Sequence, residues 1–334
     1  MTAPDDAPIS VREIGSFHVG GGLVTLSGLA PRELVSVPGG PVHHADPNGE
    51  IAAGQMYVQF VALAQPRGRV PVLMWHGGGG SGVNWETTPD GREGWQMRFL
   101  RAGVDVYLCD SVERGRATWA PYPYVYTSEP FFRTAREAWE VTFRFGPAGS
   151  WDPDPARRVA HPGQRFPVDT VDQFMKQTMP RWATNDQAAQ AAYQALIARV
   201  GPCVLVAHSQ GGHFALDTAL AAPDQIRAVV LLDASGAPDP SLADAALLRD
   251  VPHLFVWGDF LDRHPFWVGT VPPVRRWYEA LRDAGVDADW LDLPARGIHG
   301  NSHALMMDDN SWEIAELVLD WLRAHELIAS GPGS

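Results

Sequence analysis

A serine at an abrupt change of sequence character is the residue on which the chemistry of this chain depends. The run Val204–His208 is apolar and rich in valine, as buried strands are, whereas Phe214–Ala222 has a helical pattern. Ser209, Gly211 and Gly212 lie between them. A serine on such a strand-turn-helix unit is held with its hydroxyl exposed at the end of a parallel sheet, with a helix N-terminus behind it. Ser209 is therefore the predicted nucleophile.

The residues around the serine also match a known spacing. Ala207, Ser209 and Gly211 follow the nucleophile-elbow pattern Gly-x-Ser-x-Gly, with a small alanine in the first glycine position. The same pattern also occurs in tight turns that only require small residues. The decision between the two interpretations depends on whether catalytic partners exist elsewhere in the chain.

Two histidines in one late loop are candidates for the general base that a serine nucleophile requires. His299 and His303 both follow the last predicted strand. We favour His303, because the turn-forming residues before it can bring its ring over the sheet. The spacing of four residues would also suit a metal pair on a helix, but Gly300 and Asn301 disfavour a helix and no third ligand stands out. We predict no metal.

The carboxylate that orients the histidine has two candidates at the ends of later strands. Asp233 ends the strand after the nucleophile strand, whereas Asp259, with Asp262 nearby, ends the following one. The usual position in such a sheet slightly favours Asp259, so the choice stays open on sequence geometry alone.

A glycine-rich loop, 76–82, follows another buried strand and leaves backbone N–H groups free to face a ligand. We predict that the backbone N–H groups of Gly78 and Gln210 form an oxyanion hole. A phosphate loop would require a lysine that is absent from this loop, and a dinucleotide site would require an acid closer than Asp110. We therefore predict no cofactor.

Three further side chains are expected to line or support the site: Trp119, His208 and His213. His208 directly precedes the serine and His213 lies just inside the following helix. Trp119 belongs to a long segment, 111–184, that is dense in proline and aromatic residues. A loop of this length inside a compact domain is usually functional, so we interpret it as a cap over the site, within a single domain of residues 1–334.

The elements that position these residues form an alternating pattern of strands and helices, which predicts a mostly parallel sheet covered on both faces. Half-exposed antiparallel strands are expected at the leading edge, where they can support a homodimer. The strands are expected at Phe17–Leu26, Gly54–Ala62, Val70–Trp75, Val104–Asp110, Val204–His208, Ile226–Leu232, His253–Asp259 and Asp287–Leu293. Helices are expected at Asn185–Val200, Phe214–Ala222 and Val274–Ala284, with a last helix that begins at Asn310 in a capping box with Glu313.

Composition excludes several classes of protein. The 334 residues carry a net charge of −13 and only one lysine, which argues against a nucleic-acid partner. No apolar run is long enough to cross a membrane.

Met1–Ser10 lacks the features of a secretory signal, so a cytoplasmic location is expected. Cys109 and Cys203 lie in predicted buried strands and suggest no disulfide framework, and the tail Ser330–Ser334 is expected to be disordered.

Taken together, the blocks of sequence around these residues resemble the α/β-hydrolase superfamily. More narrowly, they resemble a small group of bacterial esterases typified by esterase 713. The blocks that carry this resemblance are Gly54–Gln59, Trp85–Trp95, Arg114–Arg116, Gly300–His303, Met306, Asp308, Asn310 and Ser311.

The resemblance implies an eight-stranded α/β-hydrolase sheet and a serine esterase. It also implies that the acid follows the strand directly after the nucleophile, which is Asp233 here. Two departures stand out: the resembled group has glutamate in the place of Asp233, and cysteines in the places of Gly78 and Gly79.

The prediction from sequence is thus an esterase with the triad Ser209, His303 and Asp233, acting on a small-molecule ester. A lactonase, amidase or carbon–carbon hydrolase would use the same triad. A non-catalytic binding protein on the same fold is the alternative from another class.

Overall fold

One eight-stranded sheet forms the centre of the protein in the computed structural model, which describes residues 7–329. Its strands lie in the order β1-β4-β6-β5-β7-β8-β9-β10. The pairs from β6 to β10 are parallel, whereas β1 and β4 are antiparallel additions at one edge. The bounds are β1 Val11–Leu26, β4 Gly49–Leu63, β5 Val72–Trp75, β6 Val106–Asp110, β7 Cys203–His208, β8 Ile226–Leu232, β9 His253–Trp257 and β10 Ala288–Asp292.

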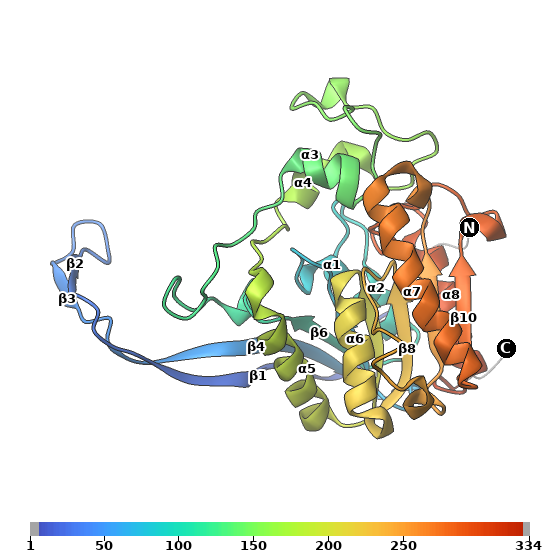
Figure 1. Ribbon diagram of the computed structural model, residues 1–334, viewed down its shortest axis with the longest axis horizontal. Helices are drawn as coiled ribbons and strands as arrows, with labels where there is room; N and C mark the ends of the chain where they lie inside the picture. The colour runs from blue at the N-terminus through green and yellow to red at the C-terminus, as the bar shows by residue number, and fades with distance from the viewer. Residues whose placement is uncertain (1–6, 330–334) are drawn as a thin grey trace.

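Helices cover both faces of this sheet (Figure 1). One face carries α5 (Asp186–Val200), α6 (Gln210–Ala221) and α7 (Pro265–Asp283), and the other carries α2 (Trp95–Arg101) and α8 (Ser311–Ala324). The shorter helices are α1 (Val83–Glu86), α3 (Ala135–Glu137) and α4 (Val171–Met175). The predicted architecture of a mostly parallel eight-stranded sheet between helical layers is confirmed.

Two hydrophobic cores result from the alternation of side chains along the central strands. In β5, Val72 and Met74 face the core under α2 and α8, whereas Leu73 and Trp75 face the core under α5, α6 and α7. Because both faces are covered, these strands are continuous apolar runs, which is why their positions were predictable from sequence.

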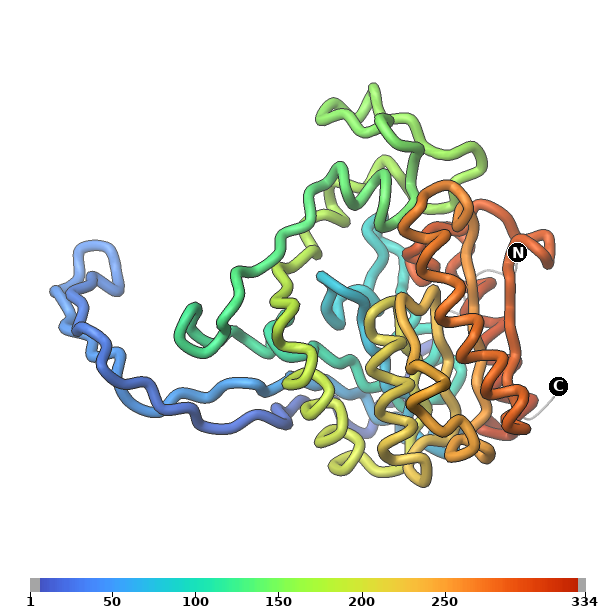
Figure 2. The backbone as a smooth tube through the Cα atoms, in the orientation of Figure 1, coloured from blue at the N-terminus to red at the C-terminus, as the bar shows by residue number. Residues whose placement is uncertain are grey.

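The antiparallel edge extends into a long two-stranded arm. β1 and β4 pair from Val11↔Leu63 to Leu26↔Gly49, but β6 pairs only with the segment 57–61 of β4. The rest of the ribbon projects from the body, with the small hairpin β2 (Arg32–Leu34) and β3 (His43–Ala45) at its tip (Figures 1 and 2). The sequence predicted the two strands but not the length of the arm.

Segment 111–184 contributes no strand to the main sheet. It is built of short helical turns between β6 and α5, and it crosses the end of the sheet at which the parallel strands terminate (Figure 2). Four of its phenylalanines, Phe143, Phe145, Phe166 and Phe174, join the core cluster that also contains α8. The segment is therefore packed onto the body through its aromatic residues.

Two local predictions were wrong. Helix α7 begins at Pro265 instead of Val274, and it contains Pro272 and Pro273. The predicted capping box of α8 is absent, since the Asn310 side chain accepts a hydrogen bond from Asn301 instead of capping the helix. Residues 1–6 of the N-terminal stretch Met1–Ser10 and the tail Ser330–Ser334, for which disorder was expected, lie outside the described residues.

Candidate active site

Ser209 lies on a strained turn between β7 and α6. Its backbone has φ 53° and ψ −119°, which is unusual for a residue other than glycine and typical of a nucleophile elbow. The turn is tight because its neighbours lack side chains. A Cβ on Gly211 would lie 2.7 Å from the His76 carbonyl oxygen, and one on Gly212 would lie 2.9 Å from Ala234 Cβ. Close packing around the turn therefore requires the glycines at positions 211 and 212.

Ser209, His303 and Asp233 form one continuous chain of hydrogen-bonding groups. His303 Nε2 lies 2.9 Å from Ser209 Oγ, and His303 Nδ1 lies 3.1 Å from Asp233 Oδ2. Because an ionised carboxylate can only accept, Nδ1 carries the proton and Nε2 is left to accept the serine proton. The aspartate therefore reaches the imidazole although it is one methylene shorter than the glutamate of the resembled group.

The electrostatic environment keeps the acid charged and the histidine neutral. Burial alone would raise the pKa of Asp233, but Arg144 and His303 lower it to about 2. Burial lowers the pKa of His303 to about 4, because its partnership with Asp233 compensates only in part for desolvation and for the nearby cations. At neutral pH the imidazole is thus in the form that can accept a proton.

A buried polar network holds the loop that carries His303. The carboxylate of Asp308 accepts hydrogen bonds from the Ser302 backbone N–H (2.9 Å), the Ser302 hydroxyl (2.6 Å) and the Asn301 side chain (2.9 Å). Burial raises the pKa of Asp308 to about 7, against the effect of these donors. His208 adds a further contact by donating from Nε2 to the His303 carbonyl oxygen at 2.7 Å.

The predicted oxyanion donors lie beside the serine. Gln210 is the first residue of α6, so its backbone N–H has no partner within the helix. The loop that contains Gly78 approaches closely, since a Cβ on the preceding Gly77 would lie 2.8 Å from Ser209 Cβ. Arg133 fixes this loop from the other side by donating to the Gly78 carbonyl oxygen at 3.1 Å.

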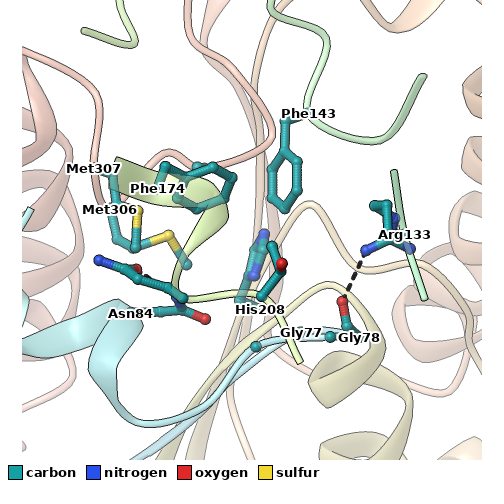
Figure 3. A pocket seen from close by; sticks show the side chains of 14 residues that line it. Gly77, Gly78, Asn84, Arg133, Phe143, Phe174, His208, Met306 and Met307 are labelled. Carbon is teal, nitrogen blue, oxygen red and sulfur yellow. Dashed lines mark hydrogen bonds between the residues drawn. The ribbon is translucent and has the colours of Figure 1, made fainter. Parts of the chain in front are cut away.

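A pocket opens between the glycine loop, the His303 loop and segment 111–184 (Figure 3). Its apolar lining includes Phe143, Phe174, Met306 and Met307, whereas Arg133 lies beside Gly78. The remaining lining residues are Gly77, Gly79, Gly80, Asn84, Gln177, Thr178, His208 and Ala304. The pocket therefore joins residues from the body and from the insertion.

The other predicted residues lie in different places. Among the three expected to line or support the site, only His208 belongs to the lining of this pocket. Trp119 is 56% exposed and packs edge-on against Trp182, and the ring of His213 faces Asp217 on α6. The roles of Trp119 and His213 in substrate binding stay predictions.

The alternative acid and base are paired with each other. Asp259 accepts from the Gly300 backbone N–H at 2.9 Å, and its Oδ2 lies 3.6 Å from His299 Nδ1. Neither residue is hydrogen-bonded to the Ser209 hydroxyl or to His303 within the described part of the chain.

Sequence reasoning missed two residues that contact the triad. Arg144 donates from Nη2 to Asp233 Oδ2 at 2.5 Å, and the Trp267 ring lies 4.4 Å from that of His303. Arg144 belongs to the aromatic-rich insertion, and Trp267 to the half of α7 that its prolines concealed. No local pattern marks either residue as part of the site.

Within residues 7–329, no group of three or more metal-binding side chains is clustered closely enough to hold an ion. None of the helices in this range is long and apolar enough to span a membrane.

Comparison with known proteins defines the class. Residues 70–271, more than half of the chain, match the family described as alpha/beta hydrolase fold, and the chain belongs to that family. A solved structure described as a novel bacterial esterase is 31% identical, with a TM-score of 0.83 over 97% of this chain and 99% of that one. A fungal protein (strain ATCC 74256) named "Probable secreted lipase phiG" is 27% identical over 80% of this chain and 85% of its own length.

Proposed function

We propose that the protein hydrolyses carboxylic esters through an acyl-enzyme intermediate. Ser209 attacks the ester carbonyl while His303 takes the serine proton, and Asp233 stabilises the imidazolium that forms. The protonated His303 then protonates the leaving alcohol. Water deprotonated by the same histidine attacks the acyl-enzyme, releases the acid and restores Ser209. The observation that carries the proposal is the unbroken contact from Ser209 Oγ through His303 to Asp233.

The negative charge that develops on the carbonyl oxygen requires donors aimed at it. We assign this role to the backbone N–H groups of Gln210 and Gly78, because both flank Ser209 and one lies at the positive end of α6. Removal of one such donor generally costs about 10²–10³ in rate.

The pocket supports an ester with a small apolar part as the substrate. Phe143, Phe174, Met306 and Met307 offer apolar contact, and the flexible methionines adapt to irregular shapes. Since the insertion supplies two of these residues, we propose that segment 111–184 serves as the cap of the site. The esterase and lipase names of the two related proteins favour an ester over the lactone, amide or carbon–carbon substrates of the same triad.

A nucleophile test decides between this function and a non-catalytic binding protein. The wild-type chain should react with a fluorophosphonate at Ser209 and should hydrolyse p-nitrophenyl esters of short acyl chains. Ser209→Ala should lose both reactions but keep its folding midpoint. Ser241→Ala is a suitable control and should keep both reactions, because the Ser241 hydroxyl lies on an exposed turn, where it donates to Asp239. Labelling of the Ser209→Ala variant, or no reaction of the wild type, would refute the proposal.

We further propose that the arm mediates a homodimer. β1 is the edge strand of the sheet, and the arm exposes Leu23, Val35, Val37 and Val42 by 52–74%. A two-stranded ribbon is marginally stable alone, and an exposed edge is a template for pairing with another strand. An antiparallel pairing of β1 with its own copy would satisfy a two-fold axis.

Light scattering after gel filtration tests the dimer. The wild type should have twice the chain mass of 36.4 kDa. A variant that joins Gly22 to Ala53, which face each other in the ribbon, through an Asn-Gly turn should be a folded monomer. A monomeric wild type at micromolar concentration, or a dimer that survives the deletion, excludes this arrangement.

The related fungal protein is named as secreted, so the compartment of this protein is a separate question from its activity. Fractionation of cells of the source organism, with antibodies to the protein, distinguishes a cytoplasmic from a secreted location.

A further inference from the structure

A buried arginine from the insertion contacts the acid of the triad. The Arg144 side chain is 1% exposed, and its Nη2 donates to Asp233 Oδ2, the same oxygen that faces His303 Nδ1. Asp233 Oδ1 accepts from the Gly258 backbone N–H at 2.8 Å. The carboxylate is therefore shared between a permanent cation and the imidazole.

The position of Arg144 is fixed by several contacts besides the ion pair. Its Nε donates to the Asp259 carbonyl oxygen at 2.7 Å, and its guanidinium lies 4.4 Å from the centre of the Trp267 ring. Gly258 leaves room for the guanidinium, because a Cβ there would lie 3.0 Å from Arg144 Nη2. The guanidinium is thus held by an ion pair, a hydrogen bond to a backbone carbonyl oxygen and an aromatic ring.

The backbone of Arg144 also indicates that the side chain is required. Its φ of 57° lies in the left-handed region, which is unfavourable for a residue other than glycine. A glycine would avoid this cost but would leave Asp233 buried without its cation. The contacts of the guanidinium offset the unfavourable backbone.

Phe143, the residue that precedes Arg144 in the insertion, contacts the triad histidine. The His303 backbone N–H donates to the Phe143 carbonyl oxygen at 3.1 Å, and the Phe143 ring packs against the imidazole. Two consecutive residues of segment 111–184 therefore fix the triad acid and the triad histidine.

Resting on the proposed esterase function, we infer that Arg144 is a positioning residue of the triad. It holds Asp233 in place and balances its charge, so that His303 stays neutral and able to accept the serine proton in mildly acidic solution. The insertion thereby completes the catalytic machinery in addition to covering it.

The charged groups around His303 show how Arg144 affects the pKa of the imidazole. The groups that face the imidazole are Asp233 from the end of β8, His208 from the end of β7, Ser209, and Arg144 and Arg133 from the insertion. Burial contributes most to the low pKa of His303, Asp233 opposes it, and the two arginines lower the pKa further. Removal of Arg144 leaves Asp233 with a stronger hold on the imidazolium and must raise the pKa of His303.

The decisive experiment compares the pH dependence of kcat/KM in four chains: wild type, Arg144→Met, Arg144→Lys and Arg158→Met. Arg158 is a matched control, because it belongs to the same insertion, is buried, pairs with Asp172 and lies over the Trp151 ring. Each measurement is restricted to pH values at which circular dichroism shows a folded chain. Between pH 8 and pH 5, wild type and Arg158→Met should change by about 2-fold or less. The kcat/KM of Arg144→Met should fall about 10-fold over the same range. This is the loss expected when the pKa of the general base lies about one unit above the lowest pH measured.

The lysine variant separates charge from packing. Arg144→Lys keeps a cation near Asp233 but cannot bridge to the Asp259 carbonyl oxygen, so kcat should fall while the acid limb stays at its wild-type position. A pH profile of folded Arg144→Met that coincides with that of the wild type overturns the inference.

A double variant tests the inference if Arg144→Met does not fold. A buried carboxylate that has lost its partner is strongly destabilising. If Arg144 acts through Asp233, combining Arg144→Met with Asp233→Asn should restore folding, whereas a double variant that stays unfolded counts against the inference.

The same variants distinguish failure of this inference from failure of the proposed function. Loss of turnover in Ser209→Ala establishes the function independently of Arg144. If the wild type has no esterase activity, NMR titration of the His303 ring still reports on Arg144. An upward shift of the ring pKa in Arg144→Met supports the inference, and no shift refutes it.

Discussion

At the scale of single residues, the two candidate acids differ in what they accept. Asp233 accepts from His303 and Arg144, whereas the carboxylate of Asp259 accepts from the Gly300 backbone. We therefore expect Asp233→Asn to lower kcat by about 10⁴, because the amide no longer holds the required tautomer of His303. Asp259→Asn should retain most of the activity. Steady-state kinetics on activated esters measures both.

The outcome of this comparison is informative in either direction. Both variants must first show wild-type fluorescence and a cooperative unfolding transition, since Asp233 is fully buried. If Asp259→Asn alone abolishes turnover, the acid assignment fails and the His303 loop must rearrange during catalysis.

At the scale of elements, one arginine clamps the turn that follows His303. Arg92 donates to the carbonyl oxygens of Met307 at 2.9 Å and Asp308 at 3.0 Å, and its Nε pairs with Asp90 at 2.6 Å. We expect Arg92→Met to destabilise the fold by about 1.5–3 kcal/mol, as lost hydrogen bonds to a charged group do. The activity should fall as well, because the loop that carries His303 loosens. Urea unfolding and kcat measure the two effects.

A surface arginine provides the comparison for this prediction. Arg69 pairs with Glu326, and both side chains are largely exposed, so Arg69→Met should change stability by about 0.5 kcal/mol or less. Equal losses of stability in Arg92→Met and Arg69→Met would mean that the hydrogen bonds from Arg92 to the turn stabilise the fold no more than an exposed ion pair does.

The elements themselves show which features are readable from sequence. Strands such as β7 and β8 were predicted because burial on both faces requires a continuous apolar run. The first half of α7 was missed because two prolines outweighed its pattern, and tertiary packing of Trp267 stabilises it nonetheless.

In the candidate site, some residues are recognisable from local sequence patterns and others only from the structure. Ser209 and His303 stand in local patterns, a tight turn and a polar loop, that can be recognised without coordinates. Arg144 acts on a residue 89 positions away, and its neighbours in sequence give no sign of that contact. Long-range pairing of this kind is fixed by the packing of the insertion, so only the structure identifies it.

At the scale of the whole molecule, burial of titratable groups on both faces of the sheet sets the response to pH. Burial lowers the pKa of His76, His253 and His303 to about 4 and that of His208 well below its usual value. These four histidines are neutral in the fold. Asp308 has the opposite effect, because burial raises its pKa to about 7, so its stabilising contribution is lost as pH rises. Burial also raises the pKa of Glu113 and Asp217, which act in the same direction as Asp308, whereas the lowered pKa of Asp233 acts with the four histidines. These five groups outnumber the three raised carboxyls, and the free energy of unfolding should therefore fall on acidification.

The sign for a histidine follows from proton binding. Below about pH 6.5 the unfolded chain binds protons that the folded chain excludes, so stability decreases as pH drops from 6.5 towards 4. His253 isolates this effect, since it lies at the start of β9, away from the triad, and its Nδ1 donates to the Val251 carbonyl oxygen. Between pH 6.5 and pH 5, His253→Gln should remove about 1.5 kcal/mol of the loss seen in the wild type, measured by urea unfolding. If His253→Gln unfolds with the wild-type pH dependence, His253 is not a source of acid instability.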